Sequence, residues 1–304
     1  MSVNTAAPQT FRRGPRDLAI KITGMVPGLA RNHCELLDLA PLLEEWGADH
    51  VILGQHLLRT GNPHPGGVTI DPRRPALDPF VILSFLAART TRLGLATGAV
   101  IAPLHHPIGL AKAAATLDLL SSGRFQLGLV AGWDGAEFAA ACVPFEERFA
   151  RLDETIDVCH TLWRDAPASF SGRWTRLDEA YSLPRPASVP ILVGGRGTAA
   201  TARRVARRAD GWIASEAARS GDVRQTVGLL REAMAAEGRA FEQLIVRATL
   251  PTPTASLRSP HQAADELLDA GATSLVLPLG AWTRDLAEAE RLVRTLADRC
   301  AQSP

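Results

Sequence analysis

The sequence predicts an α/β fold, a single (β/α)8 barrel of the TIM type with insertion loops. The chain has 304 residues, which is enough for such a barrel and its connections. Short apolar runs alternate with longer segments of helical periodicity, and this alternation is typical of a parallel sheet. We count eight strand–helix units and no internal sequence repeat. A doubly wound sheet fits the same alternation, so the count of units leaves that fold open.

The predicted elements follow one another as strand and helix along the chain. The strands are the short apolar runs Leu18–Ile22, His50–Leu53, Leu93–Ala99, Phe125–Val130, Val189–Val193, Trp212–Ala214, Leu244–Leu250 and Ser274–Pro278. The helices are Cys34–Trp46, Asp78–Ala88, Pro107–Leu120, Phe145–Trp163, Thr198–Arg208, Val223–Glu237, His261–Ala270 and Arg284–Cys300. Gly47 stands at a helix C-cap position, and Asp78 with Pro79 marks a helix start.

Segments outside these elements carry further expectations. We expect residues 1–16 to be a flexible tail, because they are polar, contain prolines and lack the apolar core of a secretory signal. Residues 17–304 would then form the single barrel domain. Two stretches, Leu57–Asp78 and Asp165–Pro190, are too long for plain connections. The first leaves the carboxyl end of the second strand, on the side where barrels place their active sites.

The composition excludes several classes of function. A net charge of +1 argues against a nucleic-acid binder, and the absence of an apolar run of 18 residues argues against a membrane span. The cysteines at 34, 142, 159 and 300 form no C-x-x-C pair, so we expect buried or half-buried free thiols and a cytoplasmic protein. Only two of the 33 basic residues are lysines, a bias typical of a high-GC bacterium.

A glycine-rich turn after the fifth predicted strand has the features of a phosphate site. Gly194, Gly195 and Gly197 let backbone amides approach an anion, and the helix that follows presents its positive end. Arg196 can pair with a phosphate, and Thr198 supplies a hydroxyl or a helix cap. A tight turn before a capped helix would have the same sequence. The segment also fits a loose G-x-G-x-x-A dinucleotide pattern, which is weak alone.

Candidate chemical groups are few. His56 closely follows the second strand and is expected in the pocket, whereas no H-x-H or H-E-x-x-H motif predicts a metal site. The chain lacks G-x-S-x-G and S-x-x-K motifs, so we expect a cofactor to carry the reaction. Asp134 and Glu137 could serve as acid or base, although carboxylates at an exposed helix start are the more common case.

Several segments match motifs of one known family: Gly123–Trp133, Glu137–Phe138, Val143–Arg148, Arg151–Glu154, Leu93–Pro107, Ala115–Asp118 and Pro190–Trp212. Together they resemble the bacterial luciferase-like superfamily of flavin and deazaflavin oxidoreductases. The branch that they resemble most is that of the coenzyme F420-dependent oxidoreductases of actinobacteria.

The resemblance implies a TIM-like barrel, often dimeric, with the cofactor ring at the carboxyl ends of the strands. His56 would lie beside the ring or the substrate. The remaining site residues divide between the pocket and the phosphate. Gly98 and Ala99 would form the end of the third strand, where many members have a bulge or a non-proline cis peptide. Ala131, Gly132 and Trp133 would line the pocket. Gly194, Gly195, Arg196, Gly197 and Thr198 would hold the phosphate and tail of the cofactor.

The sequence departs from the family pattern at two places. Many members have Asp-His after the second strand, where this chain has Gln55-His56. Many have Arg-His-Pro or Arg-Asn-Pro before the third helix, where this chain has His105-His106-Pro107. The loss of the acid at 55 removes a partner that would orient His56.

These observations predict an enzyme that transfers a hydride between coenzyme F420 and a small organic substrate, with His56 orienting or protonating the substrate and Trp133 walling the pocket. One alternative is a luciferase-like monooxygenase that uses reduced FMN and oxygen, since both cofactors carry a ribityl chain and a phosphate. The other is a barrel that binds a ligand without turnover. We expect a homodimer.

Overall fold

The computed structural model describes residues 16–22, 33–63, 71–73, 75–254 and 259–302. The predicted tail therefore lies outside the described residues except for Arg16, and so does part of the loop predicted over Leu57–Asp78.

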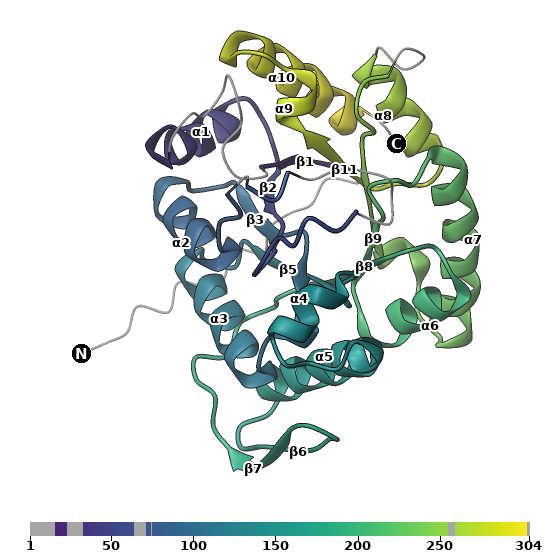
Figure 1. Ribbon diagram of the computed structural model, residues 1–304. Coiled ribbons are helices and arrows are strands. Elements are labelled where there is room, and N and C mark those ends of the chain that lie inside the picture. Colours follow the sequence, from purple (N-terminus) through teal and green to yellow (C-terminus); the bar gives the residue numbers. More distant parts are fainter. Residues whose placement is uncertain (1–15, 23–32, 64–70, 74, 255–258, 303–304) are drawn as a thin grey trace.

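The strands form one closed parallel barrel (Figure 1). They are β1 (Asp17–Lys21), β2 (His50–Leu53), β3 (Gly94–Thr97), β4 (Val100–Ile101), β5 (Phe125–Val130), β8 (Ile191–Gly195), β9 (Gly211–Ala214), β10 (Ile245–Thr249) and β11 (Ser274–Pro278). The first and last strands pair in register, with Asp17 opposite Ser274, and β3 and β4 both pair with β5. Because β3 and β4 share one place in the sheet, the barrel has eight positions. The predicted fold is confirmed, and the doubly wound sheet is excluded.

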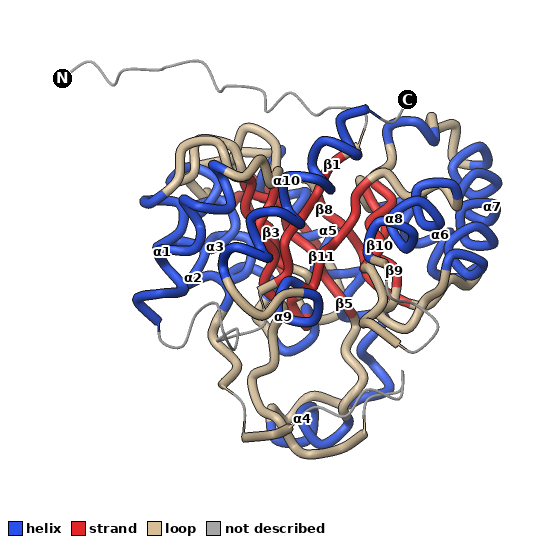
Figure 2. Tube along the Cα trace, turned by 90° about the horizontal axis from the view of Figure 1, so that it is seen from above, coloured by secondary structure: helices blue, strands red, loops and turns tan. Residues whose placement is uncertain are grey.

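Most of the helices surround the barrel on its outside, and the short helix α4 (Gly135–Ala140) lies beyond one end of it (Figures 1 and 2). The helices are α1 (His33–Glu45), α2 (Pro79–Arg89), α3 (Pro107–Leu120), α4 (Gly135–Ala140), α5 (Arg148–Arg164), α6 (Ala199–Arg208), α7 (Ser220–Ala236), α8 (Pro260–Asp269), α9 (Leu279–Trp282) and α10 (Leu286–Gln302). Sequence explains several of their starts: Asp78 accepts a hydrogen bond from the Val81 amide, and Pro79 is the first residue of α2. Among the described residues, no helix combines the length and the apolar character that a membrane crossing requires.

The stretch Asp165–Pro190, which is too long for a plain connection, contains an antiparallel hairpin. Its strands are β6 (Ala168–Ser171) and β7 (Arg176–Ala180), and it projects past α5 in Figure 1. The carboxylate of Glu154 accepts hydrogen bonds from three successive amides at the turn, those of Arg173, Trp174 and Thr175. Since the hairpin leads from a helix to the next strand, it lies at the amino ends of the barrel strands.

Arg124, in the G-R-F segment of the family resemblance, is a structural residue. Only 9% of it is exposed, and its guanidinium donates hydrogen bonds to the carbonyls of Ser121, Leu93, Thr90 and Ala87 over 2.6–3.1 Å. These carbonyls belong to the ends of α2 and α3 and to the start of β3. Arg124 therefore joins two helix ends to the barrel, where free carbonyls need donors.

The thiols only partly match the expectation. Cys159 and Cys300 are buried and free, whereas Cys142 is exposed. Cys142 follows α4 in a turn and has a positive φ of 56°. The side chain of Cys34 lies outside the described residues.

The interior of the barrel changes character along its axis. Ala19, Ile52, Ala96 and Val276 form a small apolar cluster in the middle. Nearer the amino ends, the interior is polar. Arg247 donates to Ser274 (2.9 Å) and to Gln126 (2.8 Å), Gln126 contacts His50 (2.9 Å), and Ser274 bonds Asp17. We call Asp17, His50, Gln126, Arg247 and Ser274 the polar layer.

Candidate active site

The predicted site residues meet at the carboxyl ends of neighbouring strands. His56 follows β2, Gly98 and Ala99 separate β3 from β4, and Trp133 follows β5. The glycine-rich segment 194–198 ends β8 and begins α6. These strands are successive neighbours in the sheet, so the four segments occupy one part of the barrel mouth.

The peptide bond between Gly98 and Ala99 is cis, as the family resemblance implies. Its two residues are half-buried, whereas Thr97 and Val100 on either side are buried. A Cβ atom at position 98 would stand 2.3 Å from Cγ2 of Ile52, so only glycine fits there. The bond therefore presents backbone to the barrel mouth.

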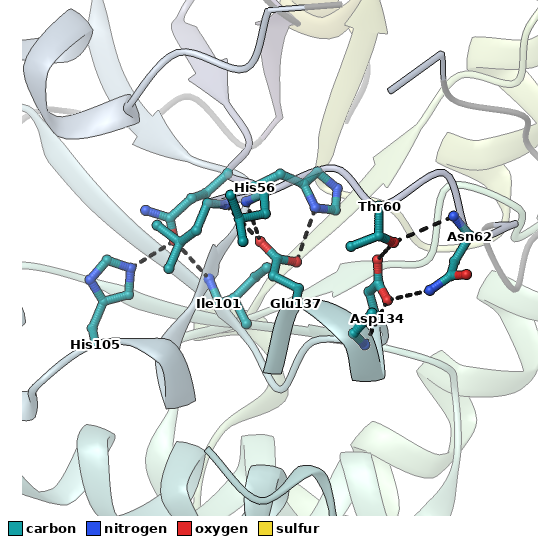
Figure 3. A network of polar contacts seen from close by, with 11 residues as sticks. His56, Thr60, Asn62, Ile101, His105, Asp134 and Glu137 are labelled. Atoms are coloured by element: carbon teal, nitrogen blue, oxygen red, sulfur yellow. Dashed lines mark hydrogen bonds and ion pairs between the residues drawn. The ribbon is translucent and has the colours of Figure 1, made fainter. Parts of the chain in front are cut away.

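His56 has a buried carboxylate partner, Glu137, which the sequence offered as a possible acid or base without pairing it with His56. Its Nδ1 lies 3.3 Å from Oε2 of Glu137, which belongs to α4 (Figure 3). The other carboxylate oxygen of Glu137 accepts hydrogen bonds from the amides of Leu57 (2.6 Å) and Leu58 (3.1 Å). One carboxylate thus fixes both the imidazole and the backbone that follows it.

The expectation of exposed carboxylates at a helix start is wrong for this segment. Glu137 is 1% exposed and Asp134 is 4% exposed, because α4 lies beyond the carboxyl ends of the strands (Figure 2) and packs on the chain after β2. The expected loss of an orienting partner for His56 is also wrong. Glu137 takes that place from a position 81 residues away.

Asp134 ties the long loop after β2 to α4. It caps α4 through the Ala136 amide (3.0 Å) and also accepts hydrogen bonds from Asn62 (2.8 Å) and Thr60 (Figure 3). Burial alone would raise the pKa of Asp134, but the bonds from Thr60, Asn62 and the backbone outweigh burial and hold it below its usual value. The start of the loop is therefore fixed above the site.

Trp133 stands beside His56, with ring centroids 6.0 Å apart and an interplanar angle of 78°. Gly132 allows this placement because it has a φ of +83°, and a Cβ there would stand 2.7 Å from Ile101 and Phe138. Ala131 is 6% exposed and packs into the core, so it supports the pocket wall.

The two departures from the family pattern lie against each other. Oε1 of Gln55 accepts hydrogen bonds from Nε2 of His105 (2.7 Å) and from the Ile101 amide (3.3 Å) (Figure 3). Burial lowers the pKa of His105, although Asp78 acts in the opposite sense. Gln55 and His105 thus form a neutral pair where the family pattern has an acid and a base. The buried Nε2 of Gln55 has no hydrogen-bond partner within the described part of the chain.

The glycine-rich segment has the features that a phosphate needs. The first amides of α6 have no intrahelical partners, and Thr198 caps the helix by accepting a hydrogen bond from one of them, the Thr201 amide (3.2 Å). Arg196 is exposed, and no hydrogen bond or ion pair joins its guanidinium to the other described residues, although its carbonyl accepts from the Thr198 amide (2.9 Å). A Cβ at Gly197 would stand 1.7 Å from Oγ1 of Thr226, and Trp212 donates to the Gly195 carbonyl (3.1 Å). The turn is therefore held in place by α7 and β9.

A metal site requires several ligating side chains close together. Across the described ranges, no three histidine, cysteine, aspartate or glutamate side chains are placed to hold a metal ion.

Comparison with known proteins gives the family. The family model described as luciferase-like monooxygenase matches residues 21–299. The chain belongs to this family. A solved structure, an F420-dependent secondary alcohol dehydrogenase in complex with an F420–acetone adduct, is similar to this chain with a TM-score of 0.73 and 16% identity over 95% of this chain and 99% of that one. At that identity the match concerns the fold.

Relatives in sequence use both kinds of cofactor. An F420-dependent glucose-6-phosphate dehydrogenase of Nakamurella multipartita is 36% identical over 69% of this chain and 60% of its own length. The oxygenase component of a flavin-dependent trigonelline monooxygenase of Acinetobacter baylyi is 33% identical over 45% of this chain and 37% of its own. The chain spans less than two thirds of the first curated relatives that it matches, 63% for uncharacterised mycobacterial proteins. The family is therefore one of oxidoreductases with two cofactor types.

Proposed function

We propose that this protein is an oxidoreductase that transfers a hydride between coenzyme F420 and a small organic substrate. The observation that carries the proposal is His56, held by the buried Glu137 beside Trp133, at the same barrel mouth as the glycine-rich turn 194–198. A histidine fixed in this way suits proton transfer, while no nucleophile motif was found in the sequence.

The residues around the barrel mouth fit the cofactor. Gly98, Ala99 and Gly132 offer backbone surface for a flat ring, with Ala131 behind them. The segment 194–198 offers helix amides, the Thr198 hydroxyl and the Arg196 guanidinium for the phosphate and the tail. When bound, F420 supplies or accepts the hydride.

The protein side chains then transfer the proton that accompanies the hydride. Glu137 faces Nδ1 of His56, so Nε2 is the atom that remains for the substrate. Reduction of a carbonyl, imine or enone needs one proton in addition to the hydride, and Nε2 would donate it; in oxidation Nε2 would accept it. Trp133 walls the pocket and limits the access of water to the hydride.

A second candidate is a monooxygenase that uses reduced FMN and oxygen. The similarity to the trigonelline monooxygenase favours it. The turn at 194–198 suits FMN as well as F420, since both carry a phosphate on a ribityl chain.

Titration of the protein with oxidised F420 and with FMN, followed by fluorescence and by heat of binding, separates these functions. Micromolar binding of F420 without binding of FMN supports the hydride transferase and leads to assays with ketones, imines and enones. Preference for FMN contradicts it and makes oxygen consumption the next assay. Binding of neither cofactor contradicts both enzymes and leaves a barrel that binds another ligand.

A further inference from the structure

Lys21 is a charged side chain at the mouth of the barrel. Successive residues of a strand face opposite sides of the sheet, so Asp17, Ala19 and Lys21 of β1 share one face. Asp17 belongs to the polar layer and Ala19 to the apolar interior cluster. The side chain of Lys21 therefore starts inside the barrel, one layer closer to the carboxyl ends.

The partner of Lys21 lies on the other side of the mouth. Nζ of Lys21 forms an ion pair with Oε1 of Glu216, which is the second residue after β9. In the sheet, β10 and β11 separate β9 from β1, so the pair spans the mouth instead of joining neighbouring strands.

The two partners differ in burial. Only 11% of the Lys21 side chain is exposed, compared with 49% of the Glu216 side chain. Burial lowers the pKa of Lys21 to about 8, so the ammonium is still mostly charged at pH 7. A buried ammonium needs an anionic partner, whereas a half-exposed carboxylate on a loop can turn into solvent at small cost. The Glu216 side chain can therefore move away from the ion pair into solvent, whereas the buried Lys21 side chain cannot.

Residue usage adds a second observation. The chain has 31 arginines and two lysines, and the other lysine, Lys112, lies on the surface, where it bonds the Leu183 carbonyl (2.7 Å). The exposed cation of the glycine-rich turn is Arg196. The mouth thus has a compact ammonium, that of Lys21, and the glycine-rich turn has a separate cation, the Arg196 guanidinium.

We propose that Lys21 is the anion-binding residue of the substrate site, and that the substrate carries a carboxylate or similar anionic group that replaces Glu216 on Lys21. The inference rests on the proposed function in so far as the mouth is the substrate site. It narrows the small organic substrate to an anionic one.

The two lysines make a direct test possible. Protein labelled with 13C-lysine gives two Cε signals, and Lys112→Arg assigns them. Benzoate is expected to shift the Lys21 signal, whereas benzamide, its neutral analogue, is not. Glu216→Gln removes the internal competitor and is expected to tighten benzoate binding about tenfold, since apparent affinity falls with the fraction of free sites. Glu146→Gln, an exposed carboxylate without a described partner, serves as the control and is expected to change nothing.

Three results would overturn the inference. The first is an unchanged Lys21 signal with benzoate in both the wild type and Glu216→Gln. The second is an equal response to benzoate and benzamide. The third is a Lys21 signal whose chemical shift changes when F420 or FMN is added alone and does not change further with benzoate. This result would assign Lys21 to cofactor binding. The benzoate titration needs no cofactor, so a protein that binds F420 and fails this test keeps its proposed function.

Discussion

At the scale of single residues, the orientation of His56 depends on one carboxylate. Glu137→Gln keeps the size of the side chain but replaces a charged acceptor with a neutral amide. We expect kcat to fall about 10- to 100-fold with unchanged cofactor affinity, because the histidine loses the charge that holds it. Steady-state kinetics together with the cofactor titration check this.

Glu146→Gln is the control for Glu137→Gln, since Glu146 is exposed and lies near the same helix. A Glu137→Gln enzyme with wild-type kcat would show that His56 needs no fixed orientation. A loss of cofactor binding instead would show that Glu137 shapes the pocket only.

The Gln55–His105 pair predicts a dependence of stability on pH. The pKa of His105 is lowered in the folded protein, mainly by burial, so between pH 7.5 and 5.5 the unfolded chain takes up a proton at this residue that the folded chain resists. Stability from this residue is present above the unfolded pKa and is lost as the pH falls below it. We expect His105→Gln to lose less stability than the wild type over this range.

Urea unfolding at the two pH values measures the difference between the two proteins. A variant that follows the wild type in parallel would contradict the prediction. Other groups that titrate there, such as Asp49 with its pKa raised to about 6, contribute equally to both proteins and cancel.

Sequence indicated some of these residues and missed others for a physical reason. His56, Gly98 and Trp133 stand directly after strands, so a strand pattern places them at the mouth. Glu137 looked like an exposed residue because its burial depends on contact with the chain after β2, 80 residues earlier. The pairing of Gln55 with His105 likewise joins two segments that no local pattern connects.

At the scale of elements, the turn before α6 depends on Gly197. A Cβ there would overlap Oγ1 of Thr226 on α7, so Gly197→Ala must move the turn away from α7. We expect cofactor affinity to fall about tenfold or more, because the amides and Arg196 move with the turn. Gly228→Ala on α7 meets no atom within 4 Å and is the matched control. Cofactor affinity is measured calorimetrically. Equal affinities of the two variants would show that the turn does not bind the cofactor.

Arg124 predicts a loss of stability without a loss of chemistry. Lysine cannot supply the fork of donors that reaches the ends of α2 and α3, so Arg124→Lys leaves buried carbonyls unpaired. We expect the free energy of unfolding to fall by about 2–4 kcal/mol. Urea denaturation measures this, with the exposed Arg92→Lys as the control. Similar midpoints for both variants would show that Arg124 does not stabilise the ends of α2 and α3.

Periodicity located the barrel strands and the long helices because each one buries a continuous apolar face. It did not locate α4, which has six residues and too few turns for a period. The hairpin β6–β7 was missed because few of its residues, such as Ala168 and Leu177, are buried, so its strands lack an alternating pattern. A carboxylate on α5, that of Glu154, holds its turn.

At the scale of the whole molecule, closure of the barrel rests on the pairing of β1 with β11. These strands are about 257 residues apart, and no local feature of either one specifies the partner. The number of units made a barrel the expected fold, but only the pairing distinguishes it from an open sheet. The domain bounds 17–304 and the homodimer stay predictions.

Sedimentation equilibrium tests the homodimer directly. The chain has a mass of 32.5 kDa, and we expect twice this value in solution. A mass that stays at 32.5 kDa at concentrations well above those of the assays would rule the dimer out.

The polar layer has a consequence for how the barrel chooses one arrangement among many. An apolar interior of similar side chains would tolerate a sliding of one strand along its neighbour. Here a slip of β10 by one residue would turn Arg247 out of the barrel and leave Ser274 and Gln126 without their donor. An unpaired polar group in a closed interior raises the free energy of the folded protein. A slip in register therefore costs more free energy with this polar layer than it would with an apolar interior. The polar layer therefore specifies the register of the strands. Because the functional groups at the mouth follow the same strands, their positions depend on that register.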